Sequence, residues 1–175
     1  MLNTTNKITD ASKLIAVADA SFVIGISLCE QWDILKALVE TLIIADKVWE
    51  EVVQQGEGRP GKKELRQATF VKRQTVSNTS AVTMLMTTLD KGEAETLVLA
   101  TELGVTNVFV DDLRGRKVAQ SLGLQTVGVA GFLLFAKKKG KIKAVRPLLL
   151  QLQQKGFRLS SRLIDAVLEE AGETL

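Results

Sequence analysis

The sequence of 175 residues contains no histidine, no tyrosine, a single cysteine and two prolines. The absence of histidine excludes a Ser-His-Asp triad, a Cys-His catalytic pair and a histidine-based zinc site. With Cys29 as its one cysteine, the chain can form no internal disulfide, so we expect a reducing compartment, the cytoplasm. The lack of tyrosine and the small number of phenylalanines disfavour a surface on which nucleobases stack.

Long hydrophobic runs are also missing. No apolar stretch continues for the roughly 18 residues that a membrane span needs, which predicts a protein without a membrane partner. Residues 1–13 are polar and do not look like a secretory signal. We expect them to form a flexible lead-in, and we expect residues 14–175 to form a single domain, because a chain of this length can bury a complete core.

What the sequence does contain is a series of short, β-branched apolar runs separated by helical patterns. Strands are predicted at residues 14–18, 42–45, 107–110 and 126–129. Helices are predicted between the strands. Ser21 is expected to cap the helix after the first strand, and Asp46 the helix after the second. A further helix is predicted at residues 64–72, and three helices are predicted at the end of the chain. No element is predicted for the polar residues 74–80. The alternation predicts an α/β fold with a central parallel sheet.

Acidic residues directly follow three of these predicted strands. Asp19 follows the first, Asp46 the second, and Asp111 and Asp112 the third. In an open α/β sheet the functional crevice lies at the carboxyl ends of the strands, so these side chains should converge there. Converging carboxylates repel one another unless a cation lies among them, and without histidine the expected cation is a hard divalent metal ion. The pattern predicts metal-dependent chemistry.

Three glutamates extend this acidic pattern onto predicted helices. Glu93 begins a helix and shares a face with Leu97 and Ala100, which should turn its carboxylate toward the sheet. Glu95 is predicted to lie nearer the flank, whereas Glu51 lies on the inward side of the helix after the second strand. Taken singly, each is more simply a helix-start or surface carboxylate. Their joint placement beside the strand-end acids is what points to a site.

The net charge of +3 conceals an uneven distribution. Residues 1–112 carry 16 acidic and 11 basic side chains, whereas residues 113–164 carry 12 basic side chains and no acidic one. A basic segment beside an acidic cluster suits a substrate with a phosphate backbone, because basic groups hold phosphates while a metal acts on them. A solvated basic surface explains the same charge equally well.

One loop matches two phosphate-binding patterns. Gly56-Glu57-Gly58-Arg59-Pro60-Gly61 fits GxGxxG and, together with Lys62, most of a P-loop. A phosphate cradle follows a strand, but the residues before this loop have a helical pattern. Pro60 removes a backbone N–H that the cradle needs, and Lys63 stands where a metal-binding hydroxyl belongs. We therefore interpret the segment as a flexible loop.

Four segments together resemble the PIN domain family, in particular its prokaryotic branch with a Gly-Glu-Ala-Glu element. They are Ala18-Asp19-Ala20-Ser21, Lys47-Val48-Trp49-Glu50-Glu51-Val52, Gly92-Glu93-Ala94-Glu95 and Val110-Asp111-Asp112-Leu113-Arg114-Gly115-Arg116. A C-terminal pattern that includes Gly156-Phe157-Arg158 continues the likeness, which covers nearly everything from residue 14 to residue 173. The motifs are short, and their order and spacing carry the resemblance.

The resemblance implies a three-layer α/β/α fold around a central parallel sheet, an acidic pocket that binds Mg²⁺ or Mn²⁺, and cleavage of single-stranded RNA. Many relatives are toxins of toxin–antitoxin pairs and form homodimers, which implies a small antitoxin protein as a partner. Carried over by position, the catalytic and metal-binding acids are Asp19, Glu51, Glu93 and Asp112, with Asp111 as an alternative to Asp112. Ser21 corresponds to a small polar residue near the metal.

The candidate RNA contacts are basic residues of the acid-free segment, namely Arg114, Arg116, Lys117, Lys137, Lys138 and Lys139. An apolar stretch either closes the core or packs across a two-fold axis in a homodimer. Its members are Phe132, Leu133, Phe135, Ala136, Leu148, Leu149 and Leu150.

Together these features lead us to interpret the chain as a metal-dependent endoribonuclease. The alternative is a catalytically inactive PIN-like module that binds RNA or protein. A metal-dependent phosphatase is a third option, for which the sequence offers no dedicated general acid.

Overall fold

The computed structural model describes residues 13–55 and 58–174, so the predicted lead-in lies outside the described residues except for Lys13. The strands are β1 (Leu14–Ala18), β2 (Val39–Ala45), β3 (Val71–Gln74), β4 (Asn107–Phe109) and β5 (Gln125–Val127). The first helices are α1 (Ala20–Leu28), α2 (Trp32–Leu38), α3 (Asp46–Trp49), the π-helical turn η1 (Glu50–Gln54), α4 (Lys62–Gln67) and α5 (Thr79–Leu85). The later helices are α6 (Lys91–Leu103), α7 (Leu113–Ser121), α8 (Val129–Lys138), α9 (Arg146–Gln154) and α10 (Ser161–Glu170).

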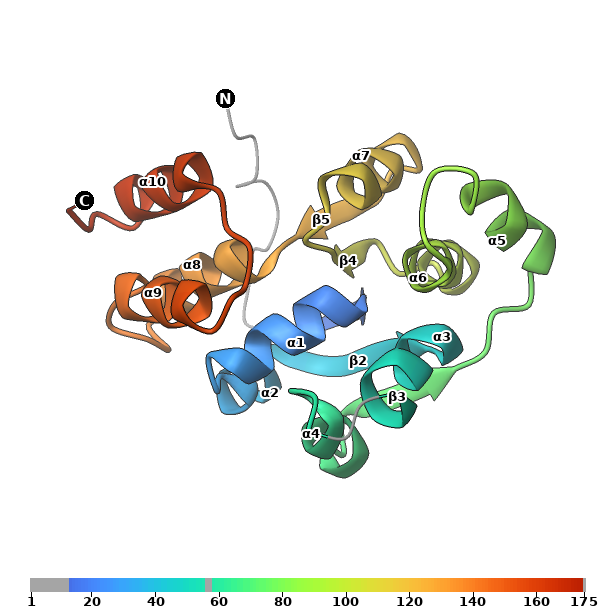
Figure 1. The fold of residues 1–175 in the computed structure, drawn as a ribbon, viewed down its shortest axis with the longest axis horizontal. Helices are drawn as coiled ribbons and strands as arrows, with labels where there is room; N and C mark the ends of the chain where they lie inside the picture. Colours follow the sequence, from blue (N-terminus) through green and yellow to red (C-terminus); the bar gives the residue numbers. More distant parts are fainter. Residues whose placement is uncertain (1–12, 56–57, 175) are drawn as a thin grey trace.

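All of these strands lie parallel in one sheet with the order β3-β2-β1-β4-β5 (Figure 1). The chain adds β2 and β3 on one side of β1 and then crosses over to add β4 and β5 on the other side. The direction of winding therefore reverses between β1 and β4, and ligands of open α/β sheets bind at the carboxyl ends of strands at such a point. Ala18 pairs in register with Phe109, so Asp19 and Val110 follow side by side.

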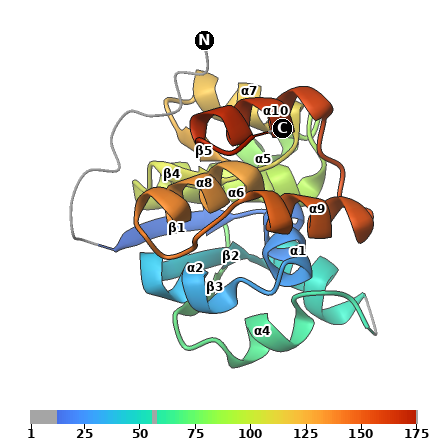
Figure 2. The ribbon, with the colours of Figure 1, turned by 90° about the vertical axis from the view of Figure 1, so that its left-hand side faces the viewer.

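The alternation of side chains along the strands divides the core into two layers. Leu42 and Phe109 face one side, where α1, α2, α8, α9 and α10 contribute to the same buried cluster. The neighbouring residues Ile43 and Val108 face the other side and pack with residues of α5, α6 and α7. Figures 1 and 2 show helices on both sides of the sheet. The three-layer α/β/α fold with a central parallel sheet is confirmed.

The predicted elements are wrong in the middle of the chain. The helix predicted at residues 64–72 is α4, which ends at Gln67, and β3 follows it at the edge of the sheet. All residues of β3 after Val71 are exposed, so this strand lacks the apolar run that identifies a buried strand in a sequence. The polar residues 74–80 lead into α5, whose N-cap Asn78 accepts a hydrogen bond from the N–H of Ala81 (3.0 Å).

The apolar stretch in α8 and α9 closes the core of the same chain. Phe132, Leu133 and Leu149 are at most 1% exposed, and Phe132 packs edge-on against Phe22 of α1 with 5.7 Å between ring centroids. Within this stretch, Leu150 is the residue that stays largely exposed, at 47%. The core therefore accounts for the feature that suggested a two-fold interface, and the homodimer rests on the resemblance alone.

Candidate active site

Asp19 lies directly after β1, where the direction of winding reverses. Its N–H donates to the carbonyl of Phe109 (3.0 Å), and its Oδ1 accepts a hydrogen bond from the N–H of Phe22 (2.8 Å). Asp19 is therefore the N-cap of α1, and the prediction of Ser21 as the cap is wrong, because Ser21 lies exposed within the first turn. The capping bond holds a carboxylate that is 3% exposed at the carboxyl end of the sheet.

Asp111 and Asp112 follow β4 but have different partners. Oδ1 of Asp111 accepts from the N–H of Val129 (2.9 Å), whereas its Oδ2 is buried without a hydrogen-bond partner among the described residues. Asp112 is the N-cap of α7, and its Oδ2 accepts from the N–H groups of Arg114 (2.7 Å) and Gly115 (3.1 Å). The two adjacent acids differ in their surroundings: Asp112 caps a helix, while Asp111 has a buried oxygen without a hydrogen-bond partner among the described residues.

Glu93 belongs to a capping box at the start of α6. Its N–H donates to Oδ1 of Asp90 (2.8 Å), and its Oε2 accepts from the N–H of Asp90 (3.1 Å). Its carboxylate faces α7, since a Cβ at Gly115 would lie 3.6 Å from Oε1 of Glu93. The charges of Glu93 and Asp19 interact, as do those of Glu93 and Asp112, so these acids form one neighbourhood.

Glu51 lies apart from that neighbourhood, in the π-helical turn η1, a kind of turn that is frequent at functional sites. A Cβ at Gly92 would lie 3.1 Å from both carboxylate oxygens of Glu51, so the glycine allows Glu51 to approach α6 closely. Burial raises the pKa of Glu51, and the acids that add to this rise are Asp90 and Glu95 rather than those at β1 and β4. The predicted set is thus divided, with Asp19, Asp111, Asp112 and Glu93 together and Glu51 beside them.

Two acids are placed wrongly by the prediction. Glu95, expected near the flank, is 9% exposed, and its Oε2 accepts from the N–H of Lys47 at the start of α3 (2.8 Å). Asp46, expected as a helix cap at the converging edge, forms an ion pair with Arg73 of β3, and Ala45 occupies the N-cap position. The hydrogen bond from Arg73 lowers the pKa of Asp46, so its charge is compensated outside the acidic site.

Burial raises the pKa of both central acids, and repulsion adds to the rise for Asp19. Burial is the main cause for Asp19, and the charge of Asp111 adds to it, so the pKa of Asp19 lies well above the usual 3.8. Burial also raises the pKa of Asp111 from 3.8 to about 6, although the N–H of Val129 and the charge of Arg116 oppose this rise. Holding both groups as carboxylates costs free energy, which a cation between them would offset.

The donor set fits a hard divalent cation in its chemistry. Among residues 13–55 and 58–174, no three Cys, Asp or Glu side chains lie close enough together to hold one metal ion in this conformation. The acids around Asp19 nevertheless offer carboxylate oxygens, the ligands that Mg²⁺ and Mn²⁺ prefer. The unpartnered Oδ2 of Asp111 and the repulsion between Asp111 and Asp19 are the two features that such an ion would resolve.

Two of the predicted RNA contacts lie beside these acids. Burial raises the pKa of Glu93, and the positive charge of Arg114 opposes that rise. The positive charge of Arg116 opposes the rise in the pKa of Asp111 in the same way. Both arginines belong to α7, and Lys117 follows them as an exposed residue. An open cleft of about 610 Å³, lined by residues of α7, α8 and α10, includes Arg116 and Asp111 in its wall. The two arginines therefore lie near the acids, and their contact with RNA stays a prediction.

The lysine run of residues 137–139 has a structural role that the sequence does not reveal. Lys137 Nζ donates to the carbonyl of Ala171 and to Oε1 of Glu173, both at 2.8 Å. Glu173 also accepts from two backbone N–H groups at the start of α9. Lys138 pairs with Glu170 of α10. Two of the three lysines therefore hold the C-terminal segment, and the role of the run in contacting RNA stays a prediction.

The sequence analysis also missed Asp90 and the inward position of Glu95. Asp90 could have been found, because an Asp three residues before a Glu is a capping-box signature. Glu95 could not, because α6 is buried on nearly all sides from Ala94 to Ala100, which removes the amphipathic contrast that separates inward from outward positions.

These observations define a class of protein, an α/β/α domain with buried carboxylates at the switch point of a parallel sheet. A family model described as a PIN domain matches residues 15–173, and the chain belongs to the PIN domain family. No curated protein and no solved structure matches the chain. Because PIN domains are generally nucleases that use divalent metals, the chain is a nuclease-like module. Within the described residues, no helix is long and apolar enough to cross a membrane.

Proposed function

We propose that this chain is a metal-dependent endoribonuclease that hydrolyses phosphodiester bonds of single-stranded RNA. The observation that carries the proposal is the pair of acids at the β1/β4 switch point: Asp19 is buried, and half-buried Asp111 has a buried Oδ2 with no partner among the described residues. A buried, unpartnered carboxylate oxygen costs free energy, and strongly perturbed acids in a crevice mark a functional site.

Mg²⁺ or Mn²⁺ would be held by Asp19 and Asp111, with Glu93 and Asp112 beside them. When bound, such an ion lowers the pKa of a water molecule and neutralises charge on a phosphate. Asp112 and Glu93 also cap α7 and α6, and these capping bonds fix the walls of the site. Glu51 stays a predicted catalytic acid on the neighbouring side of α6.

The residues of α7 and α1 supply the contacts to the substrate. Arg114 and Arg116 are placed to hold the phosphate that is attacked, because their charges already act on Glu93 and Asp111. Ser21 is exposed in the first turn of α1, two residues after Asp19, where its hydroxyl can hydrogen-bond the substrate.

The test is cleavage of a labelled single-stranded RNA of mixed sequence by the purified chain with Mn²⁺ or Mg²⁺. Asp19→Asn and Asp111→Asn, purified in parallel, should each reduce the rate by at least about 100-fold, since a metal contributes several kcal/mol and each 1.36 kcal/mol is tenfold. Glu51→Gln, in the same assay, measures the contribution of the separate acid. EDTA should stop cleavage by the wild type. Equal rates for wild type and Asp19→Asn would identify a contaminating nuclease and defeat the proposal.

The alternative is an inactive PIN-like module that binds RNA or protein, and it wins if the wild type binds RNA but cleaves none with either metal. A toxin role, a small antitoxin partner and a homodimer are proposals that rest on the family resemblance. Toxicity of the expressed chain that Asp19→Asn abolishes would support the first, whereas sedimentation as a monomer at micromolar concentration would contradict the homodimer. The cytoplasm stays the predicted compartment.

A further inference from the structure

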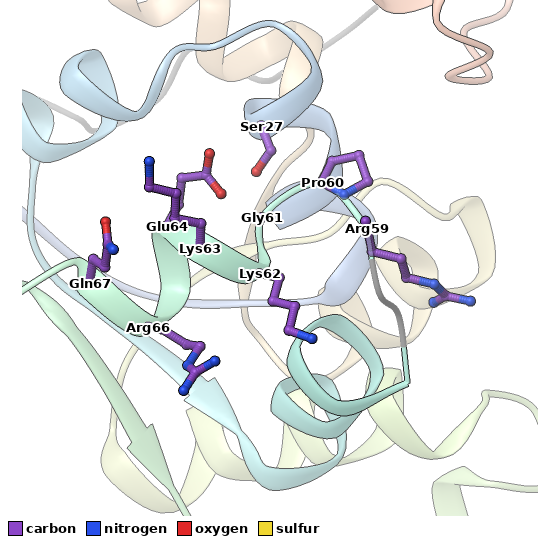
Figure 3. A pocket seen from close by; sticks show the side chains of 10 residues that line it. Ser27, Arg59, Pro60, Gly61, Lys62, Lys63, Glu64, Arg66 and Gln67 are labelled. Carbon is purple, nitrogen blue, oxygen red and sulfur yellow. The ribbon is translucent and has the colours of Figure 1, made fainter.

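A basic surface lies on α4 and on the turn before it. Residues 59–66 contain Arg59, Lys62, Lys63 and Arg66, which we call the α4 patch, and a single carboxylate, that of Glu64. Four positive charges and one negative charge give this short segment a net charge of +3, as large as that of the whole chain. Figure 3 shows these side chains around an open hollow of about 700 Å³.

The α4 patch is built on a fixed platform. Gly61 has a φ of +95° and lies so close to α1 that a Cβ would be 3.0 Å from Oγ of Ser27. Leu65 is 2% exposed and anchors α4 in the core. Because these two contacts hold one side of the segment, Lys63 and Arg66 remain exposed on its surface.

The α4 patch has no ion pair within the part of the chain that the structure describes. None of its four basic side chains forms an ion pair with a carboxylate of these residues, in contrast to Lys137 and Lys138. Figure 3 shows Lys62 and Arg66 extending in the same direction from α4, with Arg59 on the preceding turn. Neighbouring cations held on a rigid surface repel one another, and they create a local field that attracts a polyanion.

Arg59 connects the α4 patch with the acidic site. Its Nη1 donates to the backbone carbonyl of Glu51 (3.4 Å). The Glu51 carboxylate in turn lies against Gly92 at the start of α6, the helix that also presents Glu93. Arg59 thus links the α4 patch to Glu51, and through Glu51 to the start of the helix that presents Glu93.

We propose that the α4 patch binds backbone phosphates of the single-stranded nucleic acid on one side of the bond that is cut. This inference rests on the proposed function, because it names the surface that holds the substrate. The described residues that line the hollow include no aromatic side chain, so the surface cannot stack bases and binds phosphates without regard to sequence. Arg59 of the GxGxxG-like segment and Lys62, which follows that segment, both belong to this surface.

The experiment measures binding without cleavage, by fluorescence anisotropy of a labelled single-stranded RNA in EDTA. The test variant is the triple substitution Lys62→Gln, Lys63→Gln and Arg66→Gln. It keeps Arg59 and its hydrogen bond to the carbonyl of Glu51. The matched control is Lys141→Gln, Lys143→Gln and Arg162→Gln, which removes the same charge from exposed residues without ion pairs among the described residues. Arg66→Gln alone serves as a second variant, and thermal melts confirm that each protein folds.

The test variant should weaken binding at least about tenfold at 0.1 M salt, and its salt slope should fall by about 0.7 for each phosphate that the protein no longer neutralises. The control should keep the wild-type slope. Equal weakening in both variants would overturn the proposal, because net charge alone would then explain binding. Competition by a polyglutamate peptide as strong as that by unlabelled RNA would also overturn it. Binding through the α4 patch without cleavage would support this inference and contradict the endoribonuclease proposal. Cleavage by the wild type, together with unchanged RNA binding by the test variant, would support the endoribonuclease and contradict this inference.

Discussion

The α4 patch and the lysine run of residues 137–139 look alike in the sequence but differ in the fold. Both are short clusters of basic residues, and the lysine run has the denser charge. In the structure Lys137 and Lys138 are paired with Glu173 and Glu170, while the α4 patch has no ion pair within the described residues. What separates a structural cation from a binding cation is therefore its partner, which no local pattern of charge contains.

The acidic residues also fall into two groups, those with an ion-pair partner within the described residues and those without one. Asp46 is paired with Arg73, and Glu95 accepts the N–H of Lys47, so both are satisfied within the chain. Asp111 has a buried oxygen without a partner among the described residues, and Asp19 lies in its field. Acids without an ion pair thus lie at the switch point and cations without an ion pair lie on the α4 patch, within the described residues; the proposed metal ion and phosphate chain would neutralise them together.

The largest effect on stability is expected from metal binding to the uncompensated acids. Mn²⁺ at about 100 times its dissociation constant should raise the free energy of unfolding of the wild type by about 2.7 kcal/mol. Asp19→Asn should lose this response while its metal-free form is equally or more stable, because repulsion from Asp111 disappears. Thermal melts with increasing Mn²⁺ measure both effects, and Glu169→Gln, at an exposed position, is the matched control. A wild-type melting temperature that neither Mn²⁺ nor Mg²⁺ changes would contradict the metal site.

A second effect of similar size is expected from pH in the metal-free protein. Asp111 has a pKa of about 6 in the folded chain, well above the usual 3.8, so unfolding releases its proton within this interval. Its contribution to stability should therefore fall by about 3 kcal/mol as the pH rises from about 4 to about 7. Asp111→Asn should reduce the pH dependence of urea unfolding, and the remainder should come from Asp19, whose pKa is also raised.

The control for that experiment comes from the compensated acids. The pKa values of Asp46 and Glu173 are lowered, so their stabilisation is present at neutral pH and is lost as the pH falls. Asp46→Asn should accordingly change the pH profile with the opposite sign to Asp111→Asn. Profiles of the same shape for the two variants would show that paired and unpaired acids do not differ in the way the structure indicates.

The sheet and the central acids could be predicted because local patterns determine them. Buried parallel strands are continuous apolar runs, and a carboxylate after such a run must lie at the carboxyl edge, as Asp19 and Asp111 do. The edge strand β3 could not be predicted, because solvent on its exposed side allows polar residues. Glu51 lies in a π-helical turn, and such a turn has no signal in the residue pattern.

The ion pairs of the lysine run were equally hidden, because they join α8 to residues more than thirty positions later in the chain. Sequence position gives no information about such contacts, which form only when α8, α9 and α10 pack together. The α4 patch is hidden in the sequence for a related reason, because the contact of Arg59 with Glu51, which connects the patch with an acid, forms only in the fold.

The smallest effect sharpens the comparison of the two basic clusters directly. Lys137→Gln should destabilise the fold by about 1.5 kcal/mol, because the partly buried Glu173 loses a charged hydrogen bond and Ala171 loses a donor. Lys138→Gln, whose ion pair is more exposed, should cost less than about 1 kcal/mol, and Arg66→Gln on the α4 patch less than about 0.5 kcal/mol. Urea midpoints at a constant m value measure all three. If Lys137→Gln is as harmless as Arg66→Gln, the lysine run is not committed to structure, and its cations return as candidates for holding RNA.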